Sequence, residues 1–302
     1  MCKKIVLLAF SMMFMSSCAH EQFKADFIIF SYDRPLQLYA LLESTEKFVT
    51  GLQQIVVIYR TSEYDFDRGY ALVRESFPYV TFVRQKREFA RDFKELLLKA
   101  LKNSQAHYII FGVDDIVVKD HVDVSASIDA MIKYNAYGCF LRLCPDINYL
   151  YSWQRPQEVP ALQQVQEGYV WRFCDAAPIS DWAYAHTVDM TIYKKNEIMH
   201  PIAHHMDFYN PNTFEAQWNQ GHLIKDVKKR HGFCYEATKI VNLPLNLVQN
   251  THTKNPHMTD EEFKPKELLK LFLDGYKMDI TKLFGIKNNS AHIEYQPIFV
   301  MR

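Results

Sequence analysis

Three glycine-containing motifs that mark common enzyme classes are missing from this chain of 302 residues. The chain has no Gly-x-Gly-x-x-Gly after its first predicted strand and no Gly-x-x-x-x-Gly-Lys-Ser/Thr, so dinucleotide binding and P-loop phosphate binding lose their usual signatures. It also has no Gly-x-Ser-x-Gly turn, which presents the nucleophile of many serine hydrolases. These absences argue against three large groups of α/β enzymes.

Charge and cysteine content narrow the range of partners. The chain carries 35 basic and 35 acidic residues, and this formal charge of zero gives no reason to expect a nucleic acid partner. Cys139, Cys144, Cys174 and Cys234 do not form the close pairs typical of zinc sites, so no structural zinc is predicted. In an exported chain these cysteines could form up to two disulfides, although the surroundings of Cys139 and Cys174 suit buried thiols equally well.

Residues 1–18 have the three parts of an export signal. Two lysines precede an apolar stretch at 5–15, and two serines come directly before Cys18. This order resembles a bacterial lipoprotein cleavage site, in which Cys18 becomes the lipidated first residue. An uncleaved membrane anchor is the alternative, although the apolar stretch is short for a spanning helix. Either interpretation predicts a membrane-associated protein attached through its N-terminus.

From residue 27 onward, short β-rich runs alternate with amphipathic helical patterns. Strands are expected at 27–31, 54–59, 79–84, 108–113 and 139–143. Helices are expected at 35–45, 64–75, 89–102, 124–134, 214–232 and 266–273. This alternation indicates an α/β fold with a mostly parallel central sheet and helices on both faces. Residues 149–180 lack the regularity and are expected to form loops with short strands that build a substrate surface.

Two adjacent carboxylates, Asp114 and Asp115, interrupt the apolar run at 108–118. A buried parallel strand would end here, at the edge of a sheet where ligands usually bind. Neighbouring carboxylates repel one another and resist burial, unless Mg²⁺ or Mn²⁺ and bound phosphates neutralise them. The pair therefore predicts a site for a divalent metal and a diphosphate. The alternative is an ordinary strand-to-loop junction at which carboxylates cap the chain.

The first predicted strand continues into Ser31-Tyr32-Asp33-Arg34-Pro35, and a leucine-rich helix that ends in Glu-Ser follows. This order resembles the opening of bacterial family 2-like GT-A glycosyltransferases, which are nucleotide-sugar enzymes with a Rossmann-like half. The acid pair then stands where these enzymes carry a metal-binding Asp-x-Asp motif. The resemblance implies a single GT-A domain at 21–302, with a donor half at 21–143 and an acceptor half at 144–302.

The resemblance also implies roles for individual residues. Asp115 is expected to bind the metal, with Asp114 nearer the sugar or ribose, and Ile116 stands where a third acid is common. The nucleotide-sugar donor is further expected to contact residues just past the first two strands, namely Ser31, Asp33, Arg34 and Arg60. For the arginines the alternative is a salt bridge to nearby acids such as Glu63 or Glu88.

Two further stretches extend the resemblance. Residues 180–193 resemble a segment of related bacterial transferases in which an aromatic turn precedes a strand leading to the acceptor region. Residues 210–215 resemble the Pro-Asn-x-x-Glu element, which implies that Glu215 is the general base. Asp181 and Asp189 are further catalytic candidates. The alternative for all three acids is structural, and for Glu215 it is a place in the first turn of a helix, where dipole and capping favour an acid.

The segment 241–250 is similar to the Asn-x-x-Gln-containing tail of the same bacterial proteins, and His252 follows it. Some members of the broader fold use a C-terminal histidine as a further metal ligand, and imidazole suits Mn²⁺ better than Mg²⁺. His252 is therefore the candidate second ligand. The alternative is a polar surface loop, because Pro256 and several polar residues surround it.

These observations together predict metal-dependent transfer of a sugar from a nucleoside diphosphate sugar to a hydroxyl of a carbohydrate or glycolipid acceptor. The export signal conflicts with this activity, because nucleotide sugars are normally cytosolic. A non-catalytic carbohydrate- or nucleotide-binding module on the same fold is therefore the alternative. A nucleotidyltransferase would share the α/β core, but its glycine-rich phosphate loop is missing.

Overall fold

The computed structural model describes residues 24–86, 92–249 and 255–302. The predicted export segment at 1–18, with Cys18, and the candidate ligand His252 lie outside the described residues. Within the described ranges, no helix is both long and apolar enough to cross a membrane.

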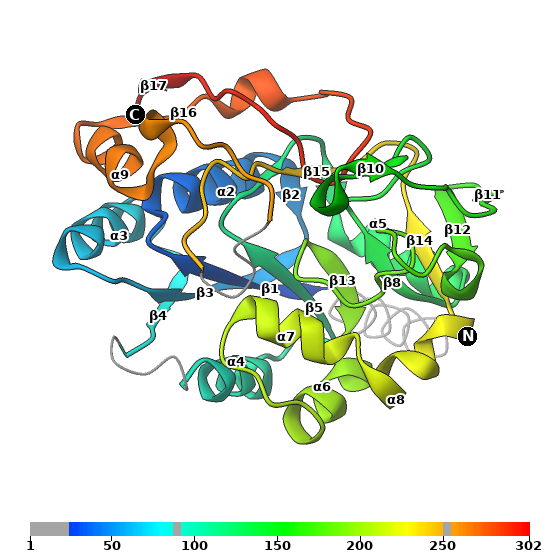
Figure 1. Cartoon of the computed structure of the whole chain (residues 1–302). Helices are drawn as coiled ribbons and strands as arrows, with labels where there is room; N and C mark the ends of the chain where they lie inside the picture. Colours follow the sequence, from blue (N-terminus) through cyan, green and yellow to red (C-terminus); the bar gives the residue numbers. More distant parts are fainter. Residues whose placement is uncertain (1–23, 87–91, 250–254) are drawn as a thin grey trace, which may run out of the picture.

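A mixed sheet of nine described strands forms the centre of the molecule, in the order β11-β12-β14-β8-β13-β5-β1-β3-β4 (Figure 1). Its strands are β1 (Ala25–Tyr32), β3 (Leu52–Arg60), β4 (Thr81–Arg84), β5 (Tyr108–Val113), β8 (Ala136–Phe140), β11 (Gln163–Val165), β12 (Gly168–Arg172), β13 (Thr191–Lys194) and β14 (His231–Cys234). Within this sheet only β12 and β13 run against the direction of β1. The prediction of a mostly parallel sheet is therefore confirmed.

Helices cover both faces of this sheet, as predicted (Figure 1). The described helices are α2 (Pro35–Phe48), α3 (Tyr64–Ser76), α4 (Asp92–Asn103), α5 (Val124–Lys133), α6 (Lys195–His204), α7 (Pro211–Trp218), α8 (Gly221–Lys225) and α9 (Pro265–Leu273). Helices α2, α3, α5 and α9 contribute buried side chains to the core on one face. Helices α4, α6, α7 and α8 contribute to the core on the other face.

The alternation of side chains along β1 connects these two cores. Phe27 and Ile29 pack into the core under α2, whereas Ile28 and Phe30 pack into the opposite core. Since both faces are buried, the strand is apolar along nearly its whole length. The Phe30 ring lies 5.0 Å from that of Phe93 in α4 and 6.4 Å from that of Phe214 in α7, centroid to centroid. Helix α7 is thereby anchored against the central strand.

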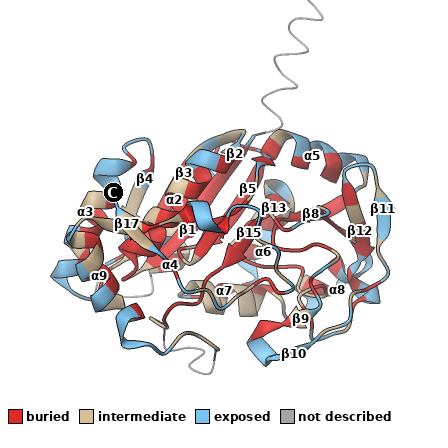
Figure 2. Ribbon diagram, turned by 90° about the horizontal axis from the view of Figure 1, so that it is seen from above, coloured by how far each residue is buried: buried red, intermediate tan, exposed pale blue. Residues whose placement is uncertain are grey.

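Short strand pairs lie outside the central sheet, as Figure 2 shows for β9 and β10. They are β2 (Val49–Thr50) with β7 (Val122–Asp123), β6 (Ile116–Val118) with β15 (Ile240–Asn242), β9 (Tyr149–Leu150) with β10 (Arg155–Pro156), and β16 (Tyr276–Met278) with β17 (Phe299–Met301). The β6–β15 pair is antiparallel and brings residues 240–242 next to the chain that follows the acid pair. The C-terminal part of the chain thus reaches the end of β5.

Two predicted elements differ from the structure. The strand expected at 139–143 lies at Ala136–Phe140. The single helix expected at 214–232 is wrong, because α7 ends at Trp218, α8 begins at Gly221, and residues 231–234 form β14. Gly221 has φ 57°, a conformation that interrupts a helix and that glycine adopts without steric cost. The strands expected near 27–31, 54–59 and 108–113 are present.

Candidate active site

The carboxyl ends of β1, β5 and β8 lie at one edge of the sheet, because these strands run in the same direction. Strand β13 starts at this edge, since Thr191 pairs with Phe140 at the end of β8. The segments that carry Asp33, Asp115 and Asp189 therefore meet there, although they are far apart in the sequence.

Arg34 is the counterion of the acid pair. Its Nη1 donates to Asp114 Oδ1 at 3.0 Å and to Asp115 Oδ2 at 3.3 Å. Its Nε donates to Asn246 Oδ1 at 2.9 Å, and its Nη2 donates to the Asn246 carbonyl oxygen. Only 8% of Arg34 is exposed. This arrangement corrects the premise that only a metal and phosphates can balance the pair. Arg34 does form salt bridges, but with the acid pair rather than with the expected partners Glu63 or Glu88, and its contact with a donor stays a prediction.

Asp114 belongs to a buried hydrogen-bond network at the end of β1. Its Oδ2 accepts from the Ser31 hydroxyl at 2.8 Å and from the Tyr32 N–H at 3.0 Å. The Ser31 hydroxyl also lies 2.5 Å from the Tyr70 phenol oxygen. Burial and then the charge of Asp114 raise the pKa of Tyr70 well above its ordinary value. Ser31 and Asp114, both predicted to contact the donor, are thus bonded to each other.

Asp115 retains one oxygen without a partner. Its Oδ1 is buried and accepts no hydrogen bond from the described part of the chain. Burial raises the pKa of Asp115 to about 6, assisted by the charge of Asp114 and opposed by Arg34 and His292. A buried carboxylate oxygen left without a donor is a place where a cation or a ligand lowers the free energy.

Asp115 fits a divalent cation as a single carboxylate ligand. Among the described residues, no three His, Cys, Asp or Glu side chains are placed to hold a metal together. The void bordered by Gln37 and the acid pair admits no water-sized molecule, and 18% of the Asp115 side chain is exposed. Mg²⁺ is often held by one or two carboxylates together with substrate phosphates and water. Metal dependence and the role of His252 stay predictions.

His292 is a nearby histidine that sequence reasoning did not single out. Its segment forms a parallel bridge with Asn242 of β15, and its ring stacks on Tyr151 at 5.9 Å between centroids. His292 is close enough for its charge to lower the pKa of Asp115. No local sequence motif marks this residue. The available signal was that it is a histidine in the C-terminal part of the chain, as His252 is.

Asp189 and Glu215 lie together beyond Asp115 at the same edge. Glu215 Oε1 accepts from the Val188 N–H at 2.7 Å, and Asp189 Oδ1 accepts from Asn242 Nδ2 at 3.0 Å. Burial, and after it the charge of Asp189, raise the pKa of Glu215 to about 7. The charge of Asp189 also contributes to the raised pKa of Asp115. Asp189 is therefore electrostatically coupled to the metal candidate and to the base candidate.

The helix-capping alternative for Glu215 is wrong. Helix α7 begins at Pro211, and its capping box joins Asn210 to Thr213, whose N–H donates to the Asn210 side chain at 2.8 Å. The first turn of α7, every residue of which is described, contains no acid. Glu215 stands in the second turn and reaches the loop before β13, so neither the cap nor the first-turn dipole accounts for its place.

The backbone beside Asp189 is strained. Met190 has φ 47°, in the left-handed region that bulky residues rarely adopt and that costs on the order of 1–3 kcal/mol. Its N–H donates to the Phe111 carbonyl at 2.8 Å, and its side chain is fully buried. The surrounding core therefore holds the turn that places Asp189 at the edge.

Asp181 is held by a buried arginine. Arg142, which is 1% exposed, donates from Nη1 to Asp181 Oδ1 at 2.8 Å and from Nη2 to the carbonyl oxygens of Asp181 and Tyr184 at 3.2 and 3.3 Å. Gln157 Nε2 donates to the other carboxylate oxygen of Asp181 at 2.9 Å. Both oxygens are thus occupied, which matches the structural alternative for this acid.

Arg142 is another residue that sequence reasoning missed. Its pKa is raised by the charges of Asp181, Asp189 and Glu215, against the opposing effect of burial. It therefore lies among the three acidic candidates. The available signal was a single charged residue in the apolar run at 139–143.

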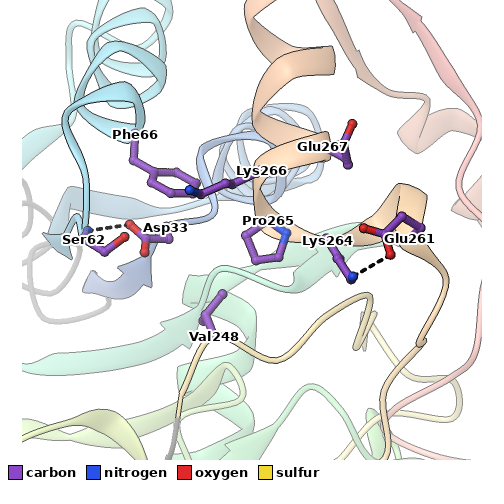
Figure 3. A pocket seen from close by; sticks show the side chains of 9 residues that line it. All are labelled: Asp33, Ser62, Phe66, Val248, Glu261, Lys264, Pro265, Lys266 and Glu267. Carbon is purple, nitrogen blue, oxygen red and sulfur yellow. Dashed lines mark hydrogen bonds and ion pairs between the residues drawn. The ribbon is translucent and has the colours of Figure 1, made fainter.

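Asp33 lies beside a cavity of about 370 Å³ near the ends of β1 and β3 (Figure 3). The cavity is lined by Asp33, Ser62, Phe66, Val248, Glu261, Lys264, Pro265, Lys266 and Glu267. Asp33 Oδ1 accepts from the Ser62 N–H at 2.8 Å, and the Asp33 N–H donates to the Arg60 carbonyl at 3.3 Å. The Arg60 guanidinium lies 5.2 Å from the centroid of the Tyr32 ring. Of the two predicted donor contacts, Asp33 therefore lines this cavity, whereas Arg60 is its backbone neighbour and is not among the lining residues.

The chain has a relative among characterised glycosyltransferases, although no family model matches it. It is 24% identical to the bifunctional glycosyltransferase pgtA of Dictyostelium discoideum over an alignment of 306 residues. The alignment covers 90% of this chain, which spans 38% of the length of that protein. The predicted resemblance to glycosyltransferases is thereby confirmed.

Two solved structures are also similar to the chain. S. aureus TarS 1-349 in complex with UDP matches with a TM-score of 0.43 and 11% identity, covering 70% of this chain and 60% of that chain. The mannosyltransferase PcManGT from Pyrobaculum calidifontis, in complex with GDP-Man and Mn²⁺, matches with a TM-score of 0.42 and 10% identity, covering 70% and 54%. Because both TM-scores are below 0.5, no residue of this chain takes a role from them.

Proposed function

We propose that this chain is a glycosyltransferase that moves a sugar from a nucleoside diphosphate sugar to a hydroxyl of a carbohydrate or glycolipid. The similarity to pgtA over 90% of the chain supports this class of reaction. The observation that carries the proposal is the convergence of three acids at one sheet edge: Asp115 with an unpartnered oxygen, Asp189, and Glu215 with a pKa of about 7.

The donor is proposed to lie between the cavity and Asp115. Its nucleoside would occupy the cavity beside Asp33, where a carboxylate can accept hydrogen bonds from ribose hydroxyls. Its diphosphate would lie near Asp115, and a divalent cation bound there would supply the positive charge that stabilises the departing diphosphate. Arg60 adds a guanidinium that suits phosphate.

Glu215 is proposed as the general base. A carboxylate with a pKa of about 7 is a stronger base than an ordinary glutamate and is still largely ionised just above neutral pH. It would take the proton of the acceptor hydroxyl as that oxygen bonds to the anomeric carbon and the bond to the diphosphate breaks. Asp189 raises the basicity of Glu215 through its negative charge.

We also propose that residues 1–18 attach the protein to a membrane, as a lipoprotein or through an uncleaved anchor. The support is the sequence of this segment, with its lysines, its apolar run and Cys18. A glycolipid or a carbohydrate held near the membrane would then be within reach as the acceptor.

The test is a donor screen on protein that lacks residues 1–18. UDP-sugars and GDP-sugars are supplied with Mn²⁺, with Mg²⁺ or with EDTA, and free nucleoside diphosphate is measured. We expect release from at least one donor, a decrease with EDTA, and a loss of about 100-fold or more in Asp115→Asn. Glu197→Gln is the control, because this acid is bonded to Arg230. Absence of both turnover and binding with every donor would rule the transferase out.

A non-catalytic nucleotide- or carbohydrate-binding module is the second candidate. It is favoured by the bonds of Arg34 to the acid pair and by the small void beside that pair. This candidate predicts that a nucleotide sugar binds equally well to the wild type and to Asp115→Asn, with or without EDTA, and that no nucleoside diphosphate is released.

A further inference from the structure

One of the four tryptophans of the chain stands apart from the core. Trp171, Trp182 and Trp218 are at most 1% exposed, whereas Trp153 is 61% exposed. Trp153 lies in a 3-10 turn, η1 (Tyr151–Trp153), between β9 and β10. In Figure 2 this hairpin projects at the margin of the molecule.

The exposed indole is held in place by its own hairpin. The Arg155 guanidinium lies 5.5 Å from the Trp153 ring, and its Nη2 donates to the Ile179 carbonyl at 3.3 Å. Gln154 turns the chain with φ 48°, and its side chain donates to the Tyr151 carbonyl at 2.8 Å. Arg155 therefore packs on the Trp153 ring, most of whose residue surface stays open to solvent at 61% exposure, and it connects the ring to Ile179, which is 49% exposed.

Contacts on two sides connect the hairpin to the sheet edge that carries the candidate acids. The Gln157 side chain accepts from the Asp181 N–H at 2.8 Å and donates to the Asp181 carboxylate at 2.9 Å. On the other side, Tyr151 stacks on His292, whose charge acts on Asp115. A ligand on Trp153 would thus be bound to a surface that is fixed relative to the acids.

The sheet order separates this surface from the cavity beside Asp33. The cavity lies at the ends of β1 and β3, whereas Asp181 is bonded to Arg142, which follows β8. Strand β5, which leads to Asp115, lies between β1 and β8 in the sheet. The donor cavity and the hairpin are therefore on opposite sides of Asp115, as expected for a donor and an acceptor that meet there.

We propose that Trp153 is the platform for a pyranose ring of the acceptor, with Arg155 at its edge. One face of a pyranose presents C–H groups, which pack on the electron-rich face of an indole while the hydroxyls stay free for hydrogen bonds. The Arg155 guanidinium then donates to hydroxyls of that sugar. The assignment rests on the proposed glycosyltransferase function and adds to it a residue that selects the acceptor.

The test compares Trp153→Ala and Trp153→Phe with Tyr64→Ala, a control in α3 whose side chain is 71% exposed. Two quantities are measured: hydrolysis of the donor without acceptor, and transfer to methyl glycosides of glucose, galactose and N-acetylglucosamine. In Trp153→Ala we expect the KM for the acceptor to rise by about tenfold or more, since the stacking surface is lost, with donor hydrolysis unchanged. Trp153→Phe keeps a smaller ring, so its KM for the acceptor should lie between those of the wild type and Trp153→Ala. An unchanged acceptor KM, or an equal loss of donor hydrolysis, overturns the platform.

Saturation-transfer NMR measures binding of the same methyl glycosides without any reaction. It therefore tests the Trp153 platform separately from the proposed glycosyltransferase activity. If the wild type neither turns over nor binds any donor, the proposed glycosyltransferase function is ruled out, and the platform is judged by this measurement alone. A signal in the wild type and in Tyr64→Ala that is absent from Trp153→Ala supports Trp153. No signal in the wild type, or an equal signal in all three proteins, overturns it.

Discussion

Two buried arginines, Arg34 and Arg142, lie at the sheet edge that carries the candidate acids. Each neutralises the carboxylates around it in a different way. Arg34 bonds to Asp114 at 3.0 Å and also reaches Asp115 at 3.3 Å, whereas Arg142 bonds to Asp181 at 2.8 Å and acts on Glu215 only through space. The acid that still touches its arginine has a pKa of about 6, and the one without such a bond has a pKa of about 7. Each arginine secures one acid and leaves a second one able to titrate.

The largest expected effect is a loss of transfer activity when Glu215, the acid near Arg142, is replaced. If Glu215 is the general base, Glu215→Gln should lower kcat/KM for transfer by about 10²–10⁴-fold, because the amide cannot take the acceptor proton. Steady-state transfer with the donor found in the screen measures it. A decrease of less than about fivefold would assign Glu215 a structural role and would leave Asp115 as the functional acid.

The next effect concerns stability and compares the two arginines. Arg142→Met and Arg34→Met should each lower the free energy of unfolding by about 3–5 kcal/mol, because each leaves a carboxylate buried without its partner. Denaturant unfolding with circular dichroism checks this. Arg84→Met is the control, since that arginine side chain is 43% exposed and its ion pair should contribute about 1 kcal/mol or less.

A smaller effect is expected on the free energy of unfolding, which the substitution Glu215→Gln should raise. The folded pKa of Glu215, about 7, lies above the ordinary value of 4.5, so the folded state holds its proton more tightly than the unfolded state. Ionisation therefore costs stability as pH rises from about 4.5 to about 7. Above pH 7 the difference is at most about 3 kcal/mol, and Glu215→Gln should recover part of it. Unfolding curves at pH 5 and pH 8 test the sign, and a gain that is larger at pH 5 would contradict it.

The last prediction, which changes no residue, concerns the dependence of transfer on pH. Transfer should fall about tenfold for each pH unit below about 7, as Glu215 takes up its proton, and more steeply below about 6, as Asp115 does the same. The slope of log(kcat/KM) against pH between 5 and 8 measures both steps. A profile that stays flat down to pH 5 would show that neither acid has to be ionised.

The strands and the acid pair were predictable because their signals are local. An apolar run ending in Asp114-Asp115 marks a buried strand and its exit, and Asp-Arg-Pro marks the start of α2. Helix α7 was only partly predicted. The helix expected from 214 misses the start at Pro211, although the capping box of Asn210 and Thr213 is a local signal, and it misses the end at Trp218, after which Gly221 interrupts the helix.

The sequence by itself determined the alternation of strands and helices, the place of the acid pair at a strand end and the position of Glu215 in a helix beside a loop. These follow from periodicity and from side-chain chemistry over a few neighbouring residues. Only the tertiary structure decided that Arg34 neutralises the acid pair, that Arg142 lies among three acids, and that His292 and Trp153 belong to the same edge. Such contacts join residues that are distant in the sequence, by 39 positions between Arg142 and Asp181, 80 between Arg34 and Asp114 and 212 between Arg34 and Asn246, and they depend on strand order, which no local pattern encodes.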